Sequence, residues 1–168
     1  MHIYLESHID LGMTSFVFTL GFHEDFIIRR LHASRAEAGD KIIVFTVKPA
    51  SGAPLKAFSN LETYCLRIGL QRPVLIEIDV RERDFTEILG DVLEVVLGLE
   101  EPVVADLSGG MRILVIAIYT AIMISRKKAV VMVSPEGEAI EHRIDIEDIR
   151  ILDTELTEEK REILEIIE

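Results

Sequence analysis

The sequence predicts an α/β fold whose mostly parallel sheet is covered by helices on both faces and closed by a C-terminal β-hairpin. Short runs of β-branched and aromatic residues alternate with longer segments that carry apolar residues at helical spacing. The strand runs are apolar throughout rather than alternating, as strands buried on both faces are. An apolar content of 49% in 168 residues is enough for one domain with a substantial core.

Regular structure is predicted to begin at Met13, so residues 1–12 are interpreted as an N-terminal extension. Apolar runs predict buried strands over 15–20, 41–47 and 74–80. A helix over 23–33 is predicted from Phe26, Ile27, Arg30 and Leu31, which recur at helical spacing. Apolar residues at helical spacing predict two more helices: Phe58, Leu61, Cys65 and Ile68 up to about Leu70, and Phe85, Ile88, Leu89, Val92 and Val96 from the capping residue Asp84 to about Leu97.

The second half of the chain contains a helix over 111–124 that is apolar on nearly every side. A helix that packs on a sheet buries only one face, so the other face needs a partner, and we expect a second copy of the chain. The remaining elements of this half are strands over 103–107, 129–133 and 139–144, the last two joined by a hairpin turn at 135–137.

The domain predicted from these elements spans 13–146, and 147–168 is interpreted as a linker followed by a helix. Thr157 is a good N-cap, acidic residues follow it, and apolar residues form a stripe. Two interpretations are open: the opening helix of a truncated winged helix-turn-helix, or a surface helix that ends the protein. The apolar stripe consists of Leu156, Ile163, Leu164 and Ile167.

Composition argues against several classes of function. The formal net charge of −12 at pH 7 disfavours a broad electrostatic grip on DNA or RNA by this chain. The single cysteine, Cys65, excludes an internal disulfide and a cysteine-based zinc site. The apolar run 113–124 is shorter than the roughly 20 residues that cross a bilayer, and no secretory signal is evident. We therefore expect a cytoplasmic chain with no membrane partner.

Several motifs of nucleotide and metal chemistry are absent from the sequence. It contains no G-x-x-x-x-G-K-[ST], no G-x-G-x-x-G after the first strand, no H-E-x-x-H and no G-x-S-x-G. We predict no metal, no cofactor and no catalytic residue. The absence of a lysine that grips a triphosphate favours a ligand with ordinary phosphodiester linkages.

The most informative segment is the glycine turn, defined here as residues 107–111, between the strand over 103–107 and the apolar helix. Gly109 and Gly110 let the backbone approach a ligand closely, and free N–H groups at a helix start bind anions. Arg112 adds a planar cation, so the turn is predicted to be the floor of a phosphate-binding pocket. Two simpler interpretations stay open: the glycines form only a tight turn, and Arg112 pairs with an acid such as Asp106.

Two other loops are predicted to lie at the same edge of the sheet, since ligands of parallel sheets bind beyond the carboxyl ends of the strands. These loops are 20–23, after the first strand, and 48–51, after the second. At the first of them, Thr19 either contacts the ligand or satisfies a backbone group. His23 is either a polar residue at a helix start or a catalyst.

The motifs T-L-G-F-H-E at 19–24 and D-L-S-G-G-M-R at 106–112 resemble those of the CRISPR-associated Rossmann-fold (CARF) sensor domains. The segments E-P-V-V-A-D-L and I-S-R-K-K, within 88–133, extend this likeness. The chain is most similar to the archaeal CARF/winged-helix regulators of type I-A CRISPR loci, and the resemblance covers most of 15–134.

The resemblance implies a Rossmann-like fold and a two-fold homodimer. It also implies that a cyclic oligoadenylate, usually cyclic tetra-adenylate, binds across the dimer axis and regulates an attached DNA-binding domain in transcriptional control. DNA would be contacted only through a winged-helix domain that this chain does not contain. The implied ligand contacts are Thr19, Gly21, Phe22, His23, Ser108, Gly109, Gly110, Met111 and Arg112, to which we add Lys48 from the loop after the second strand.

An alternative hypothesis is a metal-independent ring nuclease that orients a ribose 2′-OH against the phosphate of cyclic tetra-adenylate. Ser108, Arg112 and His23, with Lys48, are the groups that could contribute. The same residues suffice for binding, so we expect a sensor rather than an enzyme. A third hypothesis, a Rossmann-like protein of another kind, would prefer a mononucleotide.

Overall fold

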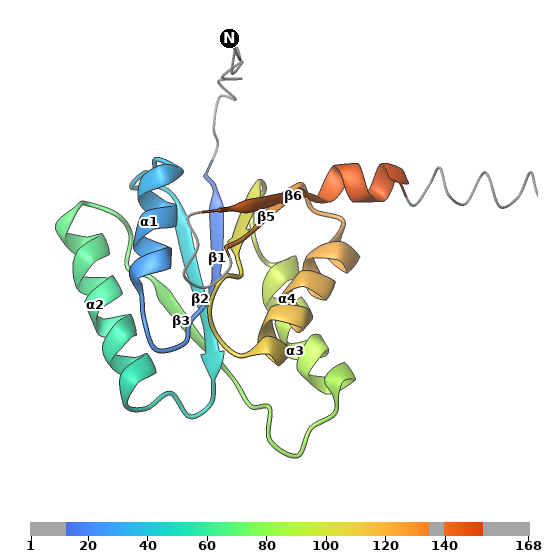
Figure 1. Cartoon of the computed structure of the whole chain (residues 1–168), viewed down its shortest axis with the longest axis horizontal. Helices are drawn as coiled ribbons and strands as arrows, with labels where there is room; N and C mark the ends of the chain where they lie inside the picture. Colours follow the sequence, from blue (N-terminus) through green and yellow to red (C-terminus); the bar gives the residue numbers. More distant parts are fainter. Residues whose placement is uncertain (1–12, 135–139, 153–168) are drawn as a thin grey trace, which may run out of the picture.

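The structure, a computed structural model, describes residues 13–134 and 140–152 (Figure 1). The predicted extension over 1–12, the hairpin turn at 135–137 and the helix after Thr157 lie outside these residues. The elements in chain order are β1 (Ser15–Thr19), α1 (Asp25–Ala33), β2 (Lys41–Val47), α2 (Ala53–Arg67), β3 (Val74–Ile78), α3 (Phe85–Leu97), β4 (Val103–Asp106), α4 (Arg112–Ser125), β5 (Ala129–Val133) and β6 (His142–Asp145).

The strands form one six-stranded sheet in the order β3-β2-β1-β4-β5-β6. β1 to β5 are parallel, and β6 pairs antiparallel with β5, so the predicted mostly parallel sheet with a terminal hairpin is confirmed. The strand order reverses between β1 and β4, which are neighbours. Phe18 of β1 is in register with Asp106 of β4, so the loops that follow these two strands start side by side.

Helices cover both faces of the sheet, as predicted. In Figure 1, α1 and α2 lie on one side of the sheet and α3 and α4 on the other. Alternate residues of β1 enter the two cores: Phe16 and Phe18 pack with residues of α1 and α2, and Val17 packs with residues of α3 and α4. This alternation explains why the three central residues of the strand are all apolar.

Several predicted boundaries and orientations are corrected by the structure. The strands over 41–47 and 129–133 are confirmed to the residue. α2 ends at Arg67, so Ile68 follows the helix and is 49% exposed instead of completing its buried stripe. Phe85 is the first residue of α3 and is 36% exposed, because the helix contacts the core only from its second turn onward. β6 spans residues 142–145 rather than 139–144.

Helical backbone continues directly after β6 over 146–152. Ile146 is fully buried in the core shared with α3 and α4. The Arg150 guanidinium donates to the carbonyl oxygens of Lys127 and Met123 at 3.3 and 3.5 Å, so this helix contacts the C-terminal end of α4. In the described part of the chain, no helix has the length and apolarity needed to cross a membrane.

Candidate functional site

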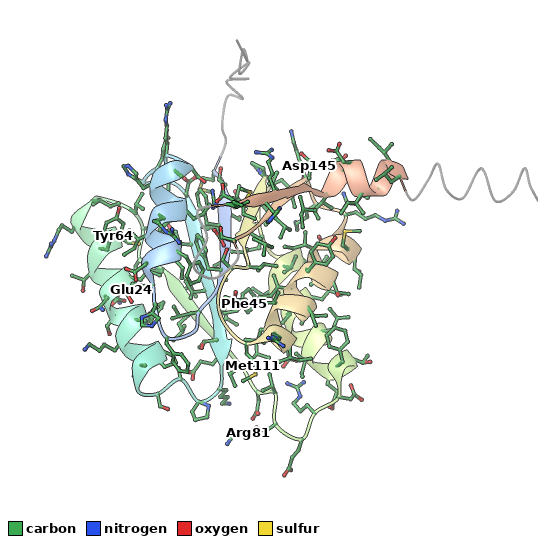
Figure 2. All side chains as sticks on the ribbon, viewed as in Figure 1. Glu24, Phe45, Tyr64, Arg81, Met111 and Asp145 are labelled. Carbon is green, nitrogen blue, oxygen red and sulfur yellow. The ribbon has the colours of Figure 1, made fainter. Side chains whose placement is uncertain are left out.

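The loop after β1 and the glycine turn after β4 contact each other directly. A Cβ atom placed on Gly21 would lie 3.2 Å from the backbone nitrogen of Gly110, which is tighter than ordinary van der Waals contact. Figure 2 labels Met111 beyond the end of the sheet at which the strands terminate. The structure therefore brings two of the predicted loops together at the point where the strand order reverses.

The two glycines of the turn are required by packing inside the protein. A Cβ on Gly109 would lie 2.5 Å from Cε1 of Phe26, a residue of α1. Gly110 has φ +80°, and a Cβ there would lie 2.8 Å from Cβ of Thr19. Gly110 thus excludes other side chains for reasons independent of a ligand, and a larger residue at 109 would require the Phe26 ring to move. The tight-turn interpretation is correct as an account of why glycine stands at these positions.

Several backbone N–H groups of the glycine turn have no acceptor among the described residues. In residues 13–134 and 140–152, the N–H groups of Gly109, Gly110, Met111 and Arg112 donate to no acceptor of the protein. Met111 is the N-cap of α4 and makes no side-chain cap, and the first turn of the helix contains no acid. Unpaired N–H groups at the positive end of a helix dipole form a site that favours an anion.

The side chains of Asp106 and Ser108, which precede the two glycines, are held by a network of hydrogen bonds. Oδ2 of the buried Asp106 accepts from Nε of Arg30 at 3.0 Å, and Oδ1 accepts from the backbone N–H of Ser108 at 3.1 Å. The Ser108 hydroxyl also donates to Oδ1, and it accepts from the N–H of Ser134 at 2.9 Å. Arg30 forms a second ion pair with Glu141, which lies just before β6. Asp106 is therefore paired with Arg30, and its proposed pairing with Arg112 is wrong.

Thr19 and Ser108 hold the turn in place. Thr19 is fully buried, and its hydroxyl donates to the carbonyl of Gly109 at 2.5 Å. Of the two roles considered for Thr19, the structure shows the one in which it satisfies a backbone group. Ser108 is half-buried, and its hydroxyl is engaged as donor and as acceptor.

The other predicted side chains are exposed around the turn. Phe22 is 70% exposed and Met111 49% exposed, and His23 and Arg112 are also exposed. The guanidinium of Arg112 makes no ion pair with any described residue. Lys48 is exposed at the end of β2, in a loop held by a 2.5 Å hydrogen bond from the N–H of Ala50 to the carboxylate of Glu77.

Sequence reasoning missed the structural partners of the turn, Arg30 and Phe26. Arg30 was placed correctly on the core-facing stripe of the first helix, where it is buried. A basic residue at such a position is rarely buried without an acid, so its placement was itself a signal of a buried carboxylate. The identity of that carboxylate required the strand order.

No group of three or more side chains suited to a metal ion occurs in the described residues. Cys65 is buried in α2, and burial raises the pKa of its thiol to about 11. The thiol is therefore protonated at neutral pH and is a weak nucleophile.

The strand order, with a glycine turn at the point of its reversal, defines a Rossmann-like domain. Residues 14–147 match the family described as the Csa3 CRISPR-associated Rossmann-like domain, and the chain belongs to this family. It is also 32% identical over 125 residues to the "CRISPR locus-related putative DNA-binding protein Csa3" of Saccharolobus solfataricus. That match covers 74% of this chain and 52% of the relative, so the chain spans about half the length of the protein it matches. The resemblance to CARF proteins is confirmed, and the chain is a CARF domain protein of the Csa3 type.

Proposed function

We propose that this chain is the sensor domain of a CRISPR-associated regulator and that it binds a cyclic oligoadenylate, with cyclic tetra-adenylate expected, across the axis of a homodimer. The observation that carries this proposal is the glycine turn. The backbone N–H groups from Gly109 to Arg112 have no acceptor among the described residues. The preceding residues Asp106 and Ser108 are held by hydrogen bonds within the protein.

The chemistry of a phosphodiester fits this turn. Each linkage carries one negative charge, which backbone N–H groups and one guanidinium can balance without a metal ion. The local charge favours such a ligand even though the whole chain is acidic, because Arg112 forms no ion pair with any described carboxylate and the first turn of α4 contains no acid.

A homodimer is supported by the outer face of α4. Ile116 and Ile124 are 54% and 51% exposed, while Leu114, Ile118 and Ile122 on the inner face are buried. Met111, the N-cap of this helix, is a further exposed apolar side chain, 49% exposed. A second copy related by a two-fold axis would cover these side chains and bring both glycine turns close to that axis.

The output of the sensor is proposed to reach DNA through a winged-helix domain that follows this one. The relative from Saccharolobus solfataricus carries DNA-binding in its name and is about twice as long as the matched segment. The net charge of −12 makes this chain itself a poor DNA ligand. The helix over 146–152 contacts the end of α4, so a shift of α4 on ligand binding has a direct path to the C-terminal segment.

Incubation of the purified chain with cyclic tetra-adenylate, with calorimetry and product analysis over time, tests the proposal. We expect binding of the intact ring by a dimer. Arg112→Ala should weaken binding about tenfold or more, the effect of losing a charge-assisted hydrogen bond. Arg29→Ala, which removes an exposed arginine from α1, is the matched control and should leave affinity unchanged.

Two outcomes would change the conclusion. If no cyclic oligoadenylate binds, the sensor proposal is wrong. If the ring is converted to linear di-adenylate over many turnovers, the protein is a ring nuclease. The bonded state of the Ser108 hydroxyl argues against that second outcome, because the hydroxyl is already held by Asp106 and Ser134.

A further inference from the structure

A hollow lies beside the glycine turn, between the start of α1 and the first half of α2. Its volume is about 340 Å³, and its lining includes Phe22, Glu24, Lys56 and Asn60. Phe22 follows Gly21, the residue that contacts Gly110, so the hollow begins one residue away from the turn. Figure 2 shows Glu24 in the space between α1 and α2. The loop that contacts the glycine turn through Gly21 therefore also borders the hollow through Phe22.

The polar edge of the hollow is a fixed pair of side chains. Nδ2 of Asn60 donates to Oε1 of Glu24 at 2.8 Å. An ionised carboxylate only accepts hydrogen bonds, so this contact decides which way the Asn60 amide points. One N–H and the Oδ1 oxygen of Asn60 remain for a ligand. An asparagine amide in this state matches the N7 acceptor and the 6-amino donor of adenine.

The apolar side of the hollow is suited to a planar ring. Phe22 is 70% exposed, which is unusual for a side chain of its size. Ala53 and Ala57 of α2 also line the hollow, and their short side chains leave room for a flat group. Stacking of a base on an exposed aromatic ring is a common mode of nucleotide binding.

Charge separates the roles of the hollow and the turn. The hollow is bordered by two carboxylates, Glu24 and Asp25, and by one ammonium group, Lys56, so its net charge is negative and disfavours a phosphate. The same carboxylates accept readily from an exocyclic amine. The glycine turn has the opposite character, with N–H groups and Arg112. A nucleotide unit thus meets acceptors where its base lies and donors where its phosphate lies.

We infer that this hollow is a purine-base subsite that selects the 6-amino group of adenine through Asn60, which Glu24 orients, with Phe22 as the stacking surface. The inference rests on the proposed function, since it assigns the base of the same ligand whose phosphate the glycine turn holds.

Competition between cyclic tetra-adenylate and a ring of equal size with 6-oxo purine (inosine) bases tests the inference. The full chain should prefer the adenine ring at least about tenfold, because a 6-oxo group would face the oxygens of Asn60 and Glu24. Asn60→Ala should still bind the adenine ring but lose most of that preference. Thr63→Ala is the matched control, since Thr63 is exposed one turn along α2 and its hydroxyl bonds only to the carbonyl of Ser59.

A second variant tests the stacking surface. Phe22→Ala should weaken binding of both rings by a similar factor, about fivefold or more, because stacking does not distinguish the bases, and Phe22→Trp should restore it. Phe22 and Asn60 are both exposed, so these variants are expected to fold.

The results separate this inference from the proposed function. If the unaltered chain binds neither ring, the proposed function fails. If it binds the adenine ring without preferring it over the 6-oxo ring, or if Asn60→Ala keeps the full preference, the base subsite is wrong and the phosphate site stands.

Discussion

The N-termini of α3 and α4 differ in how their unpaired backbone N–H groups are capped. Both helices begin after a parallel strand, and both must satisfy N–H groups that have no partner within the helix. At α3 the chain supplies its own acceptors: the Asp84 carboxylate accepts from the N–H of Glu87 at 2.9 Å, and the Glu87 carboxylate accepts from the N–H of Asp84 at 3.1 Å. At α4 the N-cap is Met111, whose side chain makes no capping hydrogen bond.

This difference indicates that the N-terminus of α4, and not that of α3, is suited to bind an anion. A capping box closes α3 with two carboxylates, which would repel a phosphate. The start of α4 has no acid in its first turn, an exposed Arg112 and a backbone turn held rigid from beneath by Asp106. We therefore infer that a ligand caps the N-terminus of α4. The N-terminus of α3, whose N–H groups are capped by side chains of the same helix start, is the comparison within the same protein.

Removal of the support beneath α4 should have the largest effect. Asp106→Ala leaves Arg30 buried without its main carboxylate and frees the Ser108 hydroxyl, so we expect a loss of about 3 kcal/mol in the free energy of unfolding. Ligand affinity should fall as well, because the turn loses its fixed shape. Urea denaturation and ligand titration measure the two effects. A variant as stable as the unaltered chain would show that the buried pair does not support the turn.

Removal of the cap at α3 should have a smaller effect, confined to stability. Asp84→Ala deletes the carboxylate that accepts from Glu87 N–H, which we expect to cost about 1 kcal/mol of stability. Affinity for cyclic tetra-adenylate should not change, in contrast with Arg112→Ala, which should lower affinity and leave stability within about 0.5 kcal/mol. Thermal melting with parallel calorimetry checks both variants. Loss of affinity in Asp84→Ala would mean that the two helix starts are not independent.

The smallest effect is expected at the exposed ion pair of α3. The hydrogen bond from Arg83 to Asp91, 2.6 Å long, lowers the pKa of Asp91, and this outweighs the opposing effect of burial. A carboxyl whose pKa is lowered on folding stabilises the protein above its ordinary pKa of about 4, and that stabilisation is lost as pH falls through the lower folded value.

Denaturation of the chain and of Asp91→Asn at pH 7 and pH 3 measures this contribution. The difference in stability between the two proteins should be small at pH 7, because the Asp91 carboxylate is exposed to solvent, and smaller again at pH 3. It should also shrink at high salt. A difference that grows on acidification would contradict the assigned pKa direction.

Local patterns in the sequence determined the elements of this protein and the place of its candidate site. The strand over 41–47 is predicted to the residue because it is one apolar run bounded by charged or turn-forming residues. α3 is predicted from Asp84 because an aspartate is a favourable N-cap directly before an apolar pattern at helical spacing, and the structure adds that Asp84 and Glu87 form a capping box. The glycine turn between β4 and α4 is equally local, and its position at the carboxyl edge follows from strand–helix alternation alone.

Contacts between distant residues were decided only by the tertiary structure. Arg30 and Asp106 are 76 positions apart, and Thr19 and Gly109 are 90 positions apart. Asn60 reaches Glu24 only because α1 and α2 lie on the same face of the sheet. Hydrophobic periodicity reports which side of an element is buried, but it carries no information on which element lies opposite. The strand order supplies that information, and it arises from the packing of the whole chain.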